Sequence, residues 1–464
     1  MIFSSIPFLY YFLPLVVAVY FVVPKPLRNF ALLCASLFFY AWGEPKYVFL
    51  MVASTLIGYI CSLFIEKCER RSVAAKLLLF FGIGINVAVL GVFKYADFTI
   101  SGLNLIPGVD LTLPGIALPV GISFYTFQIL SYCVDVYRGD VPAQKNFVNF
   151  AAYVTMFPQL IAGPIVRYKD VNLQLESRTH STEKLYKGLQ RFIIGLSKKV
   201  LIANQLGELC SAYKASDEST VLFAWMYAIA YALHVYFDFS GYSDMAIGLG
   251  KIFGFDFIEN FNYPYISKSA TEFWRRWHMS LGTWFRDYVY IPMGGNRVRF
   301  MRWIFNILTV WALTGLWHGA SMSFVVWGLY FAVLLVLEKL FLIKFLEKLP
   351  KFISHIYTLL AVFISFVIFD SESFSFAGQR IAALFGGGTS GLVGAETLYY
   401  LRSYAVIFIV GIIASMPVAK LYRKKVKQTK AVVAVETTVC AALLIVVTAY
   451  LVDGSFNPFL YFRF

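Results

Sequence analysis

"YVFLMVASTLIGYICSLFI" runs from Tyr47 to Ile65 without a single charged side chain. A helix of about 20 apolar residues spans the roughly 30 Å hydrocarbon core of a bilayer, so this stretch predicts a transmembrane helix. Similar runs recur at Ile6–Val23, Ala75–Phe93, Phe352–Phe369, Ser403–Leu421 and Ala431–Tyr450. Their repetition predicts a polytopic membrane protein.

The composition of the whole chain supports this class. Of its 464 residues, 59% are hydrophobic and only 14% are charged, whereas soluble domains carry about 25% charged residues. We expect an all-α fold with roughly ten to twelve transmembrane helices and additional re-entrant or interfacial helices. No linker or repeat divides the chain, so we expect one domain over residues 1–464. The six cysteines form no C-x-x-C pair, and no metal site is indicated.

The distribution of Lys and Arg predicts the orientation. The chain has a net charge of +14. In a membrane protein, surplus Lys and Arg residues usually lie in cytoplasmic loops, so this charge needs no nucleic-acid partner. Lys25–Arg28, Glu66–Arg71, Glu338–Lys351 and Lys420–Lys430 are rich in basic residues, whereas Thr99–Gly115 has none. Counting crossings between these loops places both termini on the extracytoplasmic side.

Two central segments fit the simple pattern of crossings less well. Phe147–Pro164 contains two prolines and need not cross the membrane, because proline interrupts a helix. Val221–Gly250 ends in the polar run "HVYFDFSGYSDMAIGLG", which suggests a broken rather than a straight helix.

The stretch "TEFWRRWHMSLGTWFRDYVYIPMGGNR", Thr271–Arg297, mixes arginines, tryptophans and acidic residues around one histidine. We call it the Arg-rich segment. This stretch is too polar to span a membrane and too apolar to lie free in water, so we expect a re-entrant or interfacial segment on the cytoplasmic side. Guanidinium groups bind pyrophosphate bidentately and indoles stack on bases, which favours a phosphorylated, flat ligand. The candidate ligand-binding residues are Trp274, Arg275, Arg276, Trp277, Arg286 and Arg297. A girdle of positive charge with an aromatic belt explains part of the same pattern.

His318 is the first candidate for chemistry. It stands in the apolar stretch Thr309–Phe331, flanked by Gly315 and Gly319, and the two halves of that stretch are each about one helix long. We therefore expect a turn near His318 that opens toward the outside. A neutral imidazole can take up and return a proton near pH 7. The alternative is a buried histidine that donates to a backbone carbonyl.

His278, inside the Arg-rich segment, is the second candidate for chemistry. His180 lies in a polar loop and is expected to be solvated, while His355 is expected near the membrane interface. His234 precedes a polar run and is a candidate for a supporting network. The candidate residues for that network are His234, Asp238, Ser240, Tyr242 and Asp244.

Several motifs together resemble a known family. "EFWRRWHMSLGTWFRDYVYIPMGGNR" (Glu272–Arg297) is similar to the long motif of the alginate O-acetyltransferase branch of the membrane-bound O-acyltransferases. "LWHGASMSFVVWG" (Leu316–Gly328) resembles the family's histidine motif. Further similar segments are Pro119–Gly139, Phe157–Tyr168, Asp238–Gly248 and Asn457–Phe464. The branch commonly has Arg where this chain has Asp370, which leaves open any role of that charge.

The resemblance implies a ring of tilted helices around a thinned centre, in a multi-pass protein of the bacterial cell membrane. It implies that acetyl-CoA is the cytoplasmic donor substrate, with no bound cofactor. The acetyl group would pass to an extracytoplasmic polysaccharide or to a partner acetyltransferase protein. His278 would lie at the inner end of a donor vestibule made by the Arg and Trp residues. His318 would act as general base on an acceptor hydroxyl, or would carry the acetyl group briefly.

Three other functions compete with this interpretation. The nearest is a D-alanyl transferase of teichoic acids, which uses a carrier-protein thioester; "YIPMGGNR" and the tail "PFLYFRF" favour the acetyl branch instead. A second is a transporter of an acyl donor or a glycan that performs no chemistry. A third is a structural scaffold for an envelope-synthesis complex.

Overall fold

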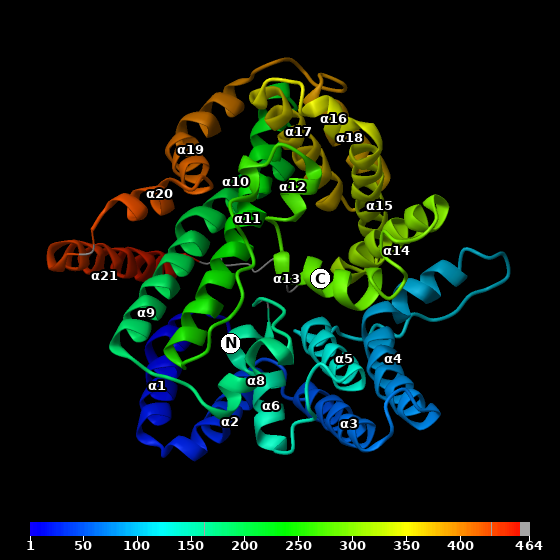
Figure 1. Ribbon diagram of the computed structural model, residues 1–464. Helices are drawn as coiled ribbons and strands as arrows, with labels where there is room; N and C mark the ends of the chain where they lie inside the picture. Colours follow the sequence, from blue (N-terminus) through cyan, green and yellow to red (C-terminus); the bar gives the residue numbers. More distant parts are fainter. Residues whose placement is uncertain (162, 428, 455–464) are drawn as a thin grey trace. The chain divides into compact units, whose positions relative to one another are not determined.

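The computed structural model describes residues 1–161, 163–427 and 429–454 (Figure 1). Within these ranges the regular elements are all helical, and the only β-type pairing is an isolated bridge between Thr220 and Gly391. The predicted all-α class is confirmed. The motif Asn457–Phe464 lies outside the described residues.

The described chain separates into two compact units. The first comprises Met1–Phe192 and Ser243–Glu259, and the second comprises Ile193–Tyr242 and the described residues from Asn260 onward. Two helices, α9 (Thr182–Ser197) and α11 (Val221–Ile252), belong partly to each unit. The expectation of one domain over residues 1–464 stays a prediction.

The first unit is built around α5 (Ile122–Arg138), a helix that is buried on nearly all sides. Its elements are η1 (Phe8–Phe12), α1 (Leu13–Val22), η2 (Lys25–Leu27), α2 (Arg28–Ala41), α3 (Tyr47–Lys67), α4 (Val73–Leu103), α5 (Ile122–Arg138), α6 (Phe147–Thr155), α7 (Phe157–Leu160), α8 (Tyr168–Glu176) and part of α9. Helices α3, α4, α6 and α8 pack against α5. Its polar residues, such as Ser123 and Asp135, are therefore enclosed by protein.

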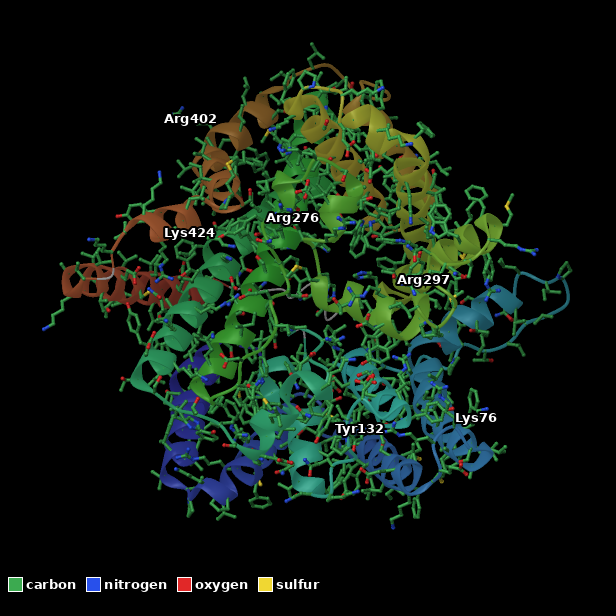
Figure 2. The ribbon with its side chains drawn as sticks, in the orientation of Figure 1. Lys76, Tyr132, Arg276, Arg297, Arg402 and Lys424 are labelled. Atoms are coloured by element: carbon green, nitrogen blue, oxygen red, sulfur yellow. The ribbon has the colours of Figure 1, made fainter. Side chains whose placement is uncertain are left out.

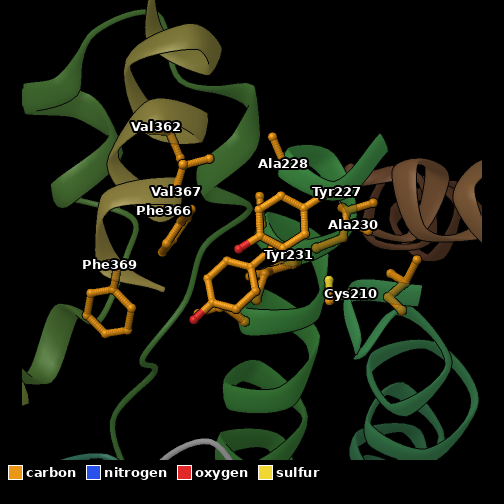
Figure 3. Close-up of a cluster of buried hydrophobic side chains, with 14 of the residues drawn as sticks. Cys210, Tyr227, Ala228, Ala230, Tyr231, Val362, Phe366, Val367 and Phe369 are labelled. Atoms are coloured by element: carbon orange, nitrogen blue, oxygen red, sulfur yellow. The ribbon is translucent and has the colours of Figure 1, made fainter. Parts of the chain in front are cut away.

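The second unit holds the larger number of helices. Its elements are η3 (Lys198–Ala203), α10 (Asn204–Ala215), η4 (Pro264–Ile266), α12 (Ala270–Trp274), α13 (Met279–Phe285), η5 (Arg286–Tyr290), α14 (Phe300–His318), α15 (Met322–Leu337), η6 (Glu338–Leu342), α16 (Ile343–Leu346), α17 (Lys351–Phe369), α18 (Phe374–Leu384), α19 (Ala395–Ala414), α20 (Val418–Lys425) and α21 (Lys430–Asp453). Its core is aromatic. Figure 3 shows the rings of Tyr227 and Tyr231 of α11 between Cys210 of α10 and Phe366 of α17.

Helices α14 and α15 form a tightly packed antiparallel pair in this unit. A Cβ atom on Gly315 would lie 2.2 Å from the carbonyl oxygen of Phe324, and one on Gly328 would lie 2.2 Å from that of Trp311. Only glycine allows such an approach of two backbones, as is common in membrane proteins. The turn between these helices follows His318, which confirms the predicted turn.

Within the described ranges, seven helices are long and apolar enough to cross a membrane, by length and composition. They are α3, α4, α11, the continuous stretch Met322–Leu346, α17, α19 and α21. The larger number of ten to twelve crossings stays a prediction. The expected break within Val221–Gly250 is wrong, because α11 runs unbroken through its polar residues. Phe147–Pro164 forms no single long helix, as its prolines predicted.

Candidate functional site

The Arg-rich segment folds as two short helices joined at His278. Helix α12 begins after Ser269, whose side chain accepts a hydrogen bond from the backbone N–H of Glu272. Its first turn is also held by Glu338, whose carboxylate accepts from the N–H groups of Ala270 and Thr271 at 2.6 and 2.8 Å. Helix N-termini leave such donors without partners and favour negative charge. Glu338 therefore fixes where α12 starts.

His278 has a left-handed backbone conformation, with φ 44° and ψ 51°. This region is sparsely populated by residues other than glycine, and such strain persists only where the surroundings enforce it. Here the flanking Met279 donates its N–H to the carbonyl of Asn260 at 2.9 Å. The side chain of His278 is 1% exposed. The local fold thus holds the imidazole in one buried position.

Hydrogen bonds define which nitrogen of His278 carries its proton. Asn260 Oδ1 accepts from the backbone N–H of Ser280 at 3.2 Å, and an N–H can only donate, so this atom is the amide oxygen. The same oxygen lies 3.2 Å from Nδ1 of His278. Nδ1 must therefore donate, which leaves Nε2 with its lone pair. Nε2 has no hydrogen-bond partner among the described residues.

Burial, and then the nearby His318, hold the pKa of His278 well below its usual range. His278 lies outside the seven candidate spans. Its imidazole is therefore neutral at pH 7. A neutral imidazole with an open Nε2 lone pair can accept a proton.

His318 ends α14 and is 3% exposed. Its ring packs edge-on against Trp317, Trp327 and Phe369, with centroid distances of 5.0, 5.1 and 5.5 Å. The Trp317 ring also lies 5.6 Å from that of His278. One indole thus touches both histidines, and the structure brings together the two residues that the sequence singled out.

A cavity of about 240 Å³ adjoins His278. Its walls come from α12, α13, η5, α14 and α15. The lining residues are Trp274, His278, Leu281, Gly282, Phe285, Arg286, Tyr290, Ile307, Val310, Trp311, Thr314 and Leu335. The lining is mostly apolar, and His318 is not part of it. Besides Nε2 of His278, the buried indole N–H of Trp274 has no hydrogen-bond partner in the part of the chain that the structure describes.

Comparison with known proteins identifies the family of this chain. Residues 141–369 match the model of the membrane-bound O-acyltransferase family. The chain is 40% identical to a probable alginate O-acetylase of Azotobacter vinelandii over the whole of both chains. It is 42% identical to a probable alginate O-acetylase of Pseudomonas aeruginosa, over 89% of this chain and 82% of the relative. It is 32% identical to a peptidoglycan O-acetyltransferase of Helicobacter pylori, over 83% and 80%.

The chain belongs to the membrane-bound O-acyltransferase family. It is an O-acyltransferase. Both His278 and His318 and all residues that line the cavity lie within the matched range 141–369. As a member of this family it is a membrane-bound enzyme. The resemblance inferred from the motifs is confirmed.

In this acyltransferase the six residues expected to bind the donor have different surroundings. Trp274 and Arg286 line the cavity beside His278. Trp277 lies in the aromatic core, with its ring centroid 5.4 Å from that of Phe273. Arg275 and Arg297 are exposed and line no part of the cavity.

Arg276 is occupied by protein partners. Its guanidinium pairs with Glu272 at 2.9 Å and donates to the carbonyl of Asn262 at 3.1 Å. Figure 2 shows Arg276 and Arg297 at separate places in the second unit. The arginines of this segment thus do not converge on one point, because two short helices and a turn direct them differently.

The expected supporting network is only partly assembled. Nδ1 of His234 lies 2.6 Å from the carbonyl oxygen of Ala203, and Asp238 forms a buried ion pair with Lys199 at 2.6 Å. Ser240 and Tyr242 are buried in the same unit. Asp244 belongs to the first unit, where it binds Arg191 at 2.8 Å.

Three other sequence expectations are refined by the structure. His180 is not simply solvated, because its Nε2 lies 2.9 Å from the hydroxyl of Tyr20. Nδ1 of His355 lies 3.0 Å from the carbonyl oxygen of Ser267. Asp370, the departure from the branch pattern, pairs with Lys214 at 2.5 Å.

Sequence reasoning missed Asn260 and Glu338. Asn260 orients the imidazole of His278, and Glu338 anchors α12, yet neither stands in a recognisable motif. Glu338 was expected in a basic cytoplasmic loop, whereas it is 1% exposed at the start of η6. A buried carboxylate needs hydrogen-bond donors, but the sequence does not indicate that the donors come from α12.

Proposed function

We propose that this enzyme takes an acetyl group from cytoplasmic acetyl-CoA and passes it across the membrane to an extracytoplasmic polysaccharide or to a partner acetyltransferase. The names of the relatives, alginate O-acetylase and peptidoglycan O-acetyltransferase, support acetyl transfer to an envelope polysaccharide. The observation that carries the proposal is the apolar cavity into which the neutral imidazole of His278 faces.

The size of the cavity supports a thioester end rather than a whole donor. Sites that enclose drug-sized ligands measure roughly 300–1,000 Å³, and this cavity measures about 240 Å³. Its apolar lining suits the acetyl thioester and the arm that carries it. Arg286 lies at its edge with a side chain that is 60% exposed, where a nucleotide phosphate would remain in water.

The chemistry moves one proton from the acceptor hydroxyl to the sulfur of CoA. As the acceptor oxygen attacks the thioester carbonyl, a C–O bond forms and the hydroxyl proton moves to an imidazole nitrogen. The C–S bond then breaks, and the proton ends on the sulfur of CoA. His278 and His318 are the proposed catalytic residues, with His278 on the thioester side and His318 acting as base on the acceptor side.

The basic-loop pattern supports the orientation that this transfer requires. We place the enzyme in the bacterial cytoplasmic membrane with both termini extracytoplasmic, because Lys420–Lys430 and Lys25–Arg28 would then face the cytoplasm. Donor access from the cytoplasm follows from this orientation.

The test uses the full chain in proteoliposomes with acetyl-CoA on one side. We expect release of the CoA thiol and transfer of labelled acetyl to alginate oligosaccharides or peptidoglycan fragments on the other side. Arg402→Gln, an exposed position on α19 (Figure 2), serves as a control that should retain activity. Consumption of a D-alanyl carrier-protein thioester but not of acetyl-CoA would show a D-alanyl transferase. Movement of donor or glycan without thiol release would show a transporter.

A further inference from the structure

A cluster of two arginines and a histidine in the first unit plays no part in the site described above. Arg28 begins α2, and Arg178 and His180 lie in the connection between α8 and α9. Arg28 lies over the ring of Tyr20, near the end of α1, and Arg178 and His180 contact the hydroxyl of that tyrosine. That hydroxyl donates to the carbonyl oxygen of Phe253 at 2.9 Å.

Hydrogen bonds connect the cluster through neutral groups. Because the Tyr20 proton is given to Phe253, the hydroxyl oxygen accepts from Nε2 of His180 at 2.9 Å. It also accepts from Nε and Nη2 of Arg178 at 3.3 and 3.2 Å. Nδ1 of His180 is then an acceptor for Nη1 of Arg28 at 3.4 Å. His180 is therefore neutral, and it offers no charge that could compensate the two guanidinium groups.

The two arginines have no acidic ion-pair partner in the part of the chain that the structure describes. Among the described residues, neither Arg28 nor Arg178 forms an ion pair with Asp or Glu, although other half-buried arginines such as Arg167 and Arg191 do. The Nε of Arg28 is buried and has no hydrogen-bond partner among them. Burial lowers the pKa of His180, and the neighbouring Arg28 and Arg178 lower it further. Partly buried charge of one sign is costly unless a counter-ion completes it.

The cluster is closely built and adjoins an exposed apolar surface. Gly254 has φ +88°, and a Cβ there would lie 3.0 Å from Nε2 of His180, so the backbone approaches the imidazole as closely as it can. Val22 at the end of α1 is 85% exposed, and Leu27 and Phe30 beside Arg28 are also exposed. In a membrane-bound enzyme an exposed apolar surface of this kind is suited to contact lipid acyl chains.

We propose that Arg28 and Arg178, positioned by their contacts with Tyr20 and the neutral His180, form a binding site for the phosphate of an anionic phospholipid, whose acyl chains lie along the exposed apolar residues of α1 and α2. Guanidinium groups bind phosphate oxygens bidentately, and basic pockets between the helices of membrane proteins bind anionic lipid headgroups. A soluble phosphate compound offers the same phosphate group, but it has no acyl chains to cover the apolar surface beside the arginines. In the orientation proposed above, in which Lys25–Arg28 faces the cytoplasm, the site lies in the cytoplasmic leaflet.

The experiment measures thermal unfolding and native mass spectra of the full chain in detergent. The probes are phosphatidylglycerol, phosphatidylcholine and inorganic phosphate. We expect phosphatidylglycerol to raise Tm more than phosphatidylcholine does, and to remain bound in the mass spectrometer. Arg28→Gln and Arg178→Gln should each weaken phosphatidylglycerol binding by roughly tenfold or more, the effect of a lost charge-assisted hydrogen bond. Arg402→Gln, an exposed arginine of the second unit, should bind like wild type.

Arg28→Lys keeps the positive charge without the planar fork, so it should fold if Arg28→Gln does not, and should bind with intermediate affinity. Equal stabilisation by phosphatidylglycerol and phosphatidylcholine overturns the proposal. So does full stabilisation by inorganic phosphate to which the lipid adds nothing, because the site would then take a soluble anion. Wild-type lipid affinity in a folded Arg28→Lys/Arg178→Lys double variant would also contradict it.

Discussion

The two histidines of the second unit are both buried, yet they are held by different forces. A polar group fixes His278: Asn260 Oδ1 lies 3.2 Å from its Nδ1 and so defines its tautomer. Aromatic packing surrounds His318, with the rings of Trp317, Trp327 and Phe369 within 5.5 Å. Only His278 lines the cavity.

The difference matters because a hydrogen bond and a packed cage constrain different properties. A hydrogen bond to one ring nitrogen decides which nitrogen carries the proton, and hence which nitrogen can act as a base. An aromatic cage decides where the ring lies and excludes water. We therefore expect the activity of His278 to depend on a single polar neighbour, and that of His318 to depend on the shape of its surroundings.

The largest effects should follow from removing either imidazole. His278→Ala and His318→Ala should each lower kcat/KM for acetyl transfer by roughly 10²–10⁴-fold, the usual contribution of a general acid or base. Their effects should differ when water replaces the polysaccharide as acyl acceptor, since His278 lies on the thioester side. Hydrolysis of acetyl-CoA by water, which releases acetate and CoA, should fall in His278→Ala and persist in His318→Ala.

Both variants must remain folded for this comparison, which size-exclusion chromatography in detergent would establish. If a folded His278→Ala protein transfers acetyl at nearly the wild-type rate, the assignment of this site is wrong. Equal loss of acetyl-CoA hydrolysis in both variants would remove the distinction between a donor-side and an acceptor-side histidine.

A smaller effect should follow from removing the orienting group. Asn260→Ala leaves Nδ1 of His278 without its acceptor, so the tautomer with an unprotonated Nε2 is no longer selected. The bond becomes charge-assisted when the imidazole is protonated, so its loss should lower kcat by roughly 10- to 100-fold. The measurement is the pH profile of kcat/KM.

The sign of the pH shift follows from the same contact. The wild-type activity should persist below pH 6.5, because the pKa of His278 is held well below its usual range. An acceptor at Nδ1 stabilises the imidazolium, so removing it lowers that pKa further, and the acid limb should move to lower pH. Asn306→Ala is the matched control: this buried asparagine donates to the carbonyls of Met293 and Gly295. It should lose stability without a shift of the acid limb.

Hydrophobic patterning sufficed to predict the fold class, and the length of the two apolar halves around His318 sufficed to predict the turn at that residue. The pattern failed at α11, where polar residues such as Asp238 suggested a break. The helix continues because the protein around it supplies partners, including the buried Lys199. Whether a helix is surrounded by protein or by lipid depends on tertiary structure, and the local hydrophobic pattern of the sequence does not indicate it.

Part of the site was also predictable. His278, Trp274 and Arg286 were expected near one another because they share a short segment, and all three line the cavity. The second wall comes from α14 and α15. The sequence predicts that these segments are apolar helices, but it does not indicate that they line the cavity. Asn260 contacts His278 across an 18-residue separation, and no composition or spacing rule indicates such a pair.

A still smaller effect should come from Glu338, which acts on the cavity only through α12. Its carboxylate accepts hydrogen bonds from two backbone N–H groups, from the hydroxyl of Thr271 and from the hydroxyl of Tyr357. In Glu338→Gln one acceptor oxygen becomes an NH₂ group that cannot accept. The loss should cost about 1–3 kcal/mol of stability and raise KM for acetyl-CoA several-fold, with kcat little changed. An unchanged KM would mean that α12 does not depend on this anchor.

The smallest effects should separate the arginines of the segment, which sequence alone treated as one group. Arg286 lines the cavity but is largely exposed and already pairs with Asp287 at 2.7 Å. Solvent screens such a contact, so Arg286→Gln should raise KM for acetyl-CoA only a few-fold. Arg275→Gln and Arg297→Gln should change KM less than twofold, because these exposed side chains line no part of the cavity. A larger rise in KM for Arg275→Gln or Arg297→Gln than for Arg286→Gln would show that the phosphates of the donor lie away from the edge of the cavity. The donor would then approach His278 from the exposed face of the segment.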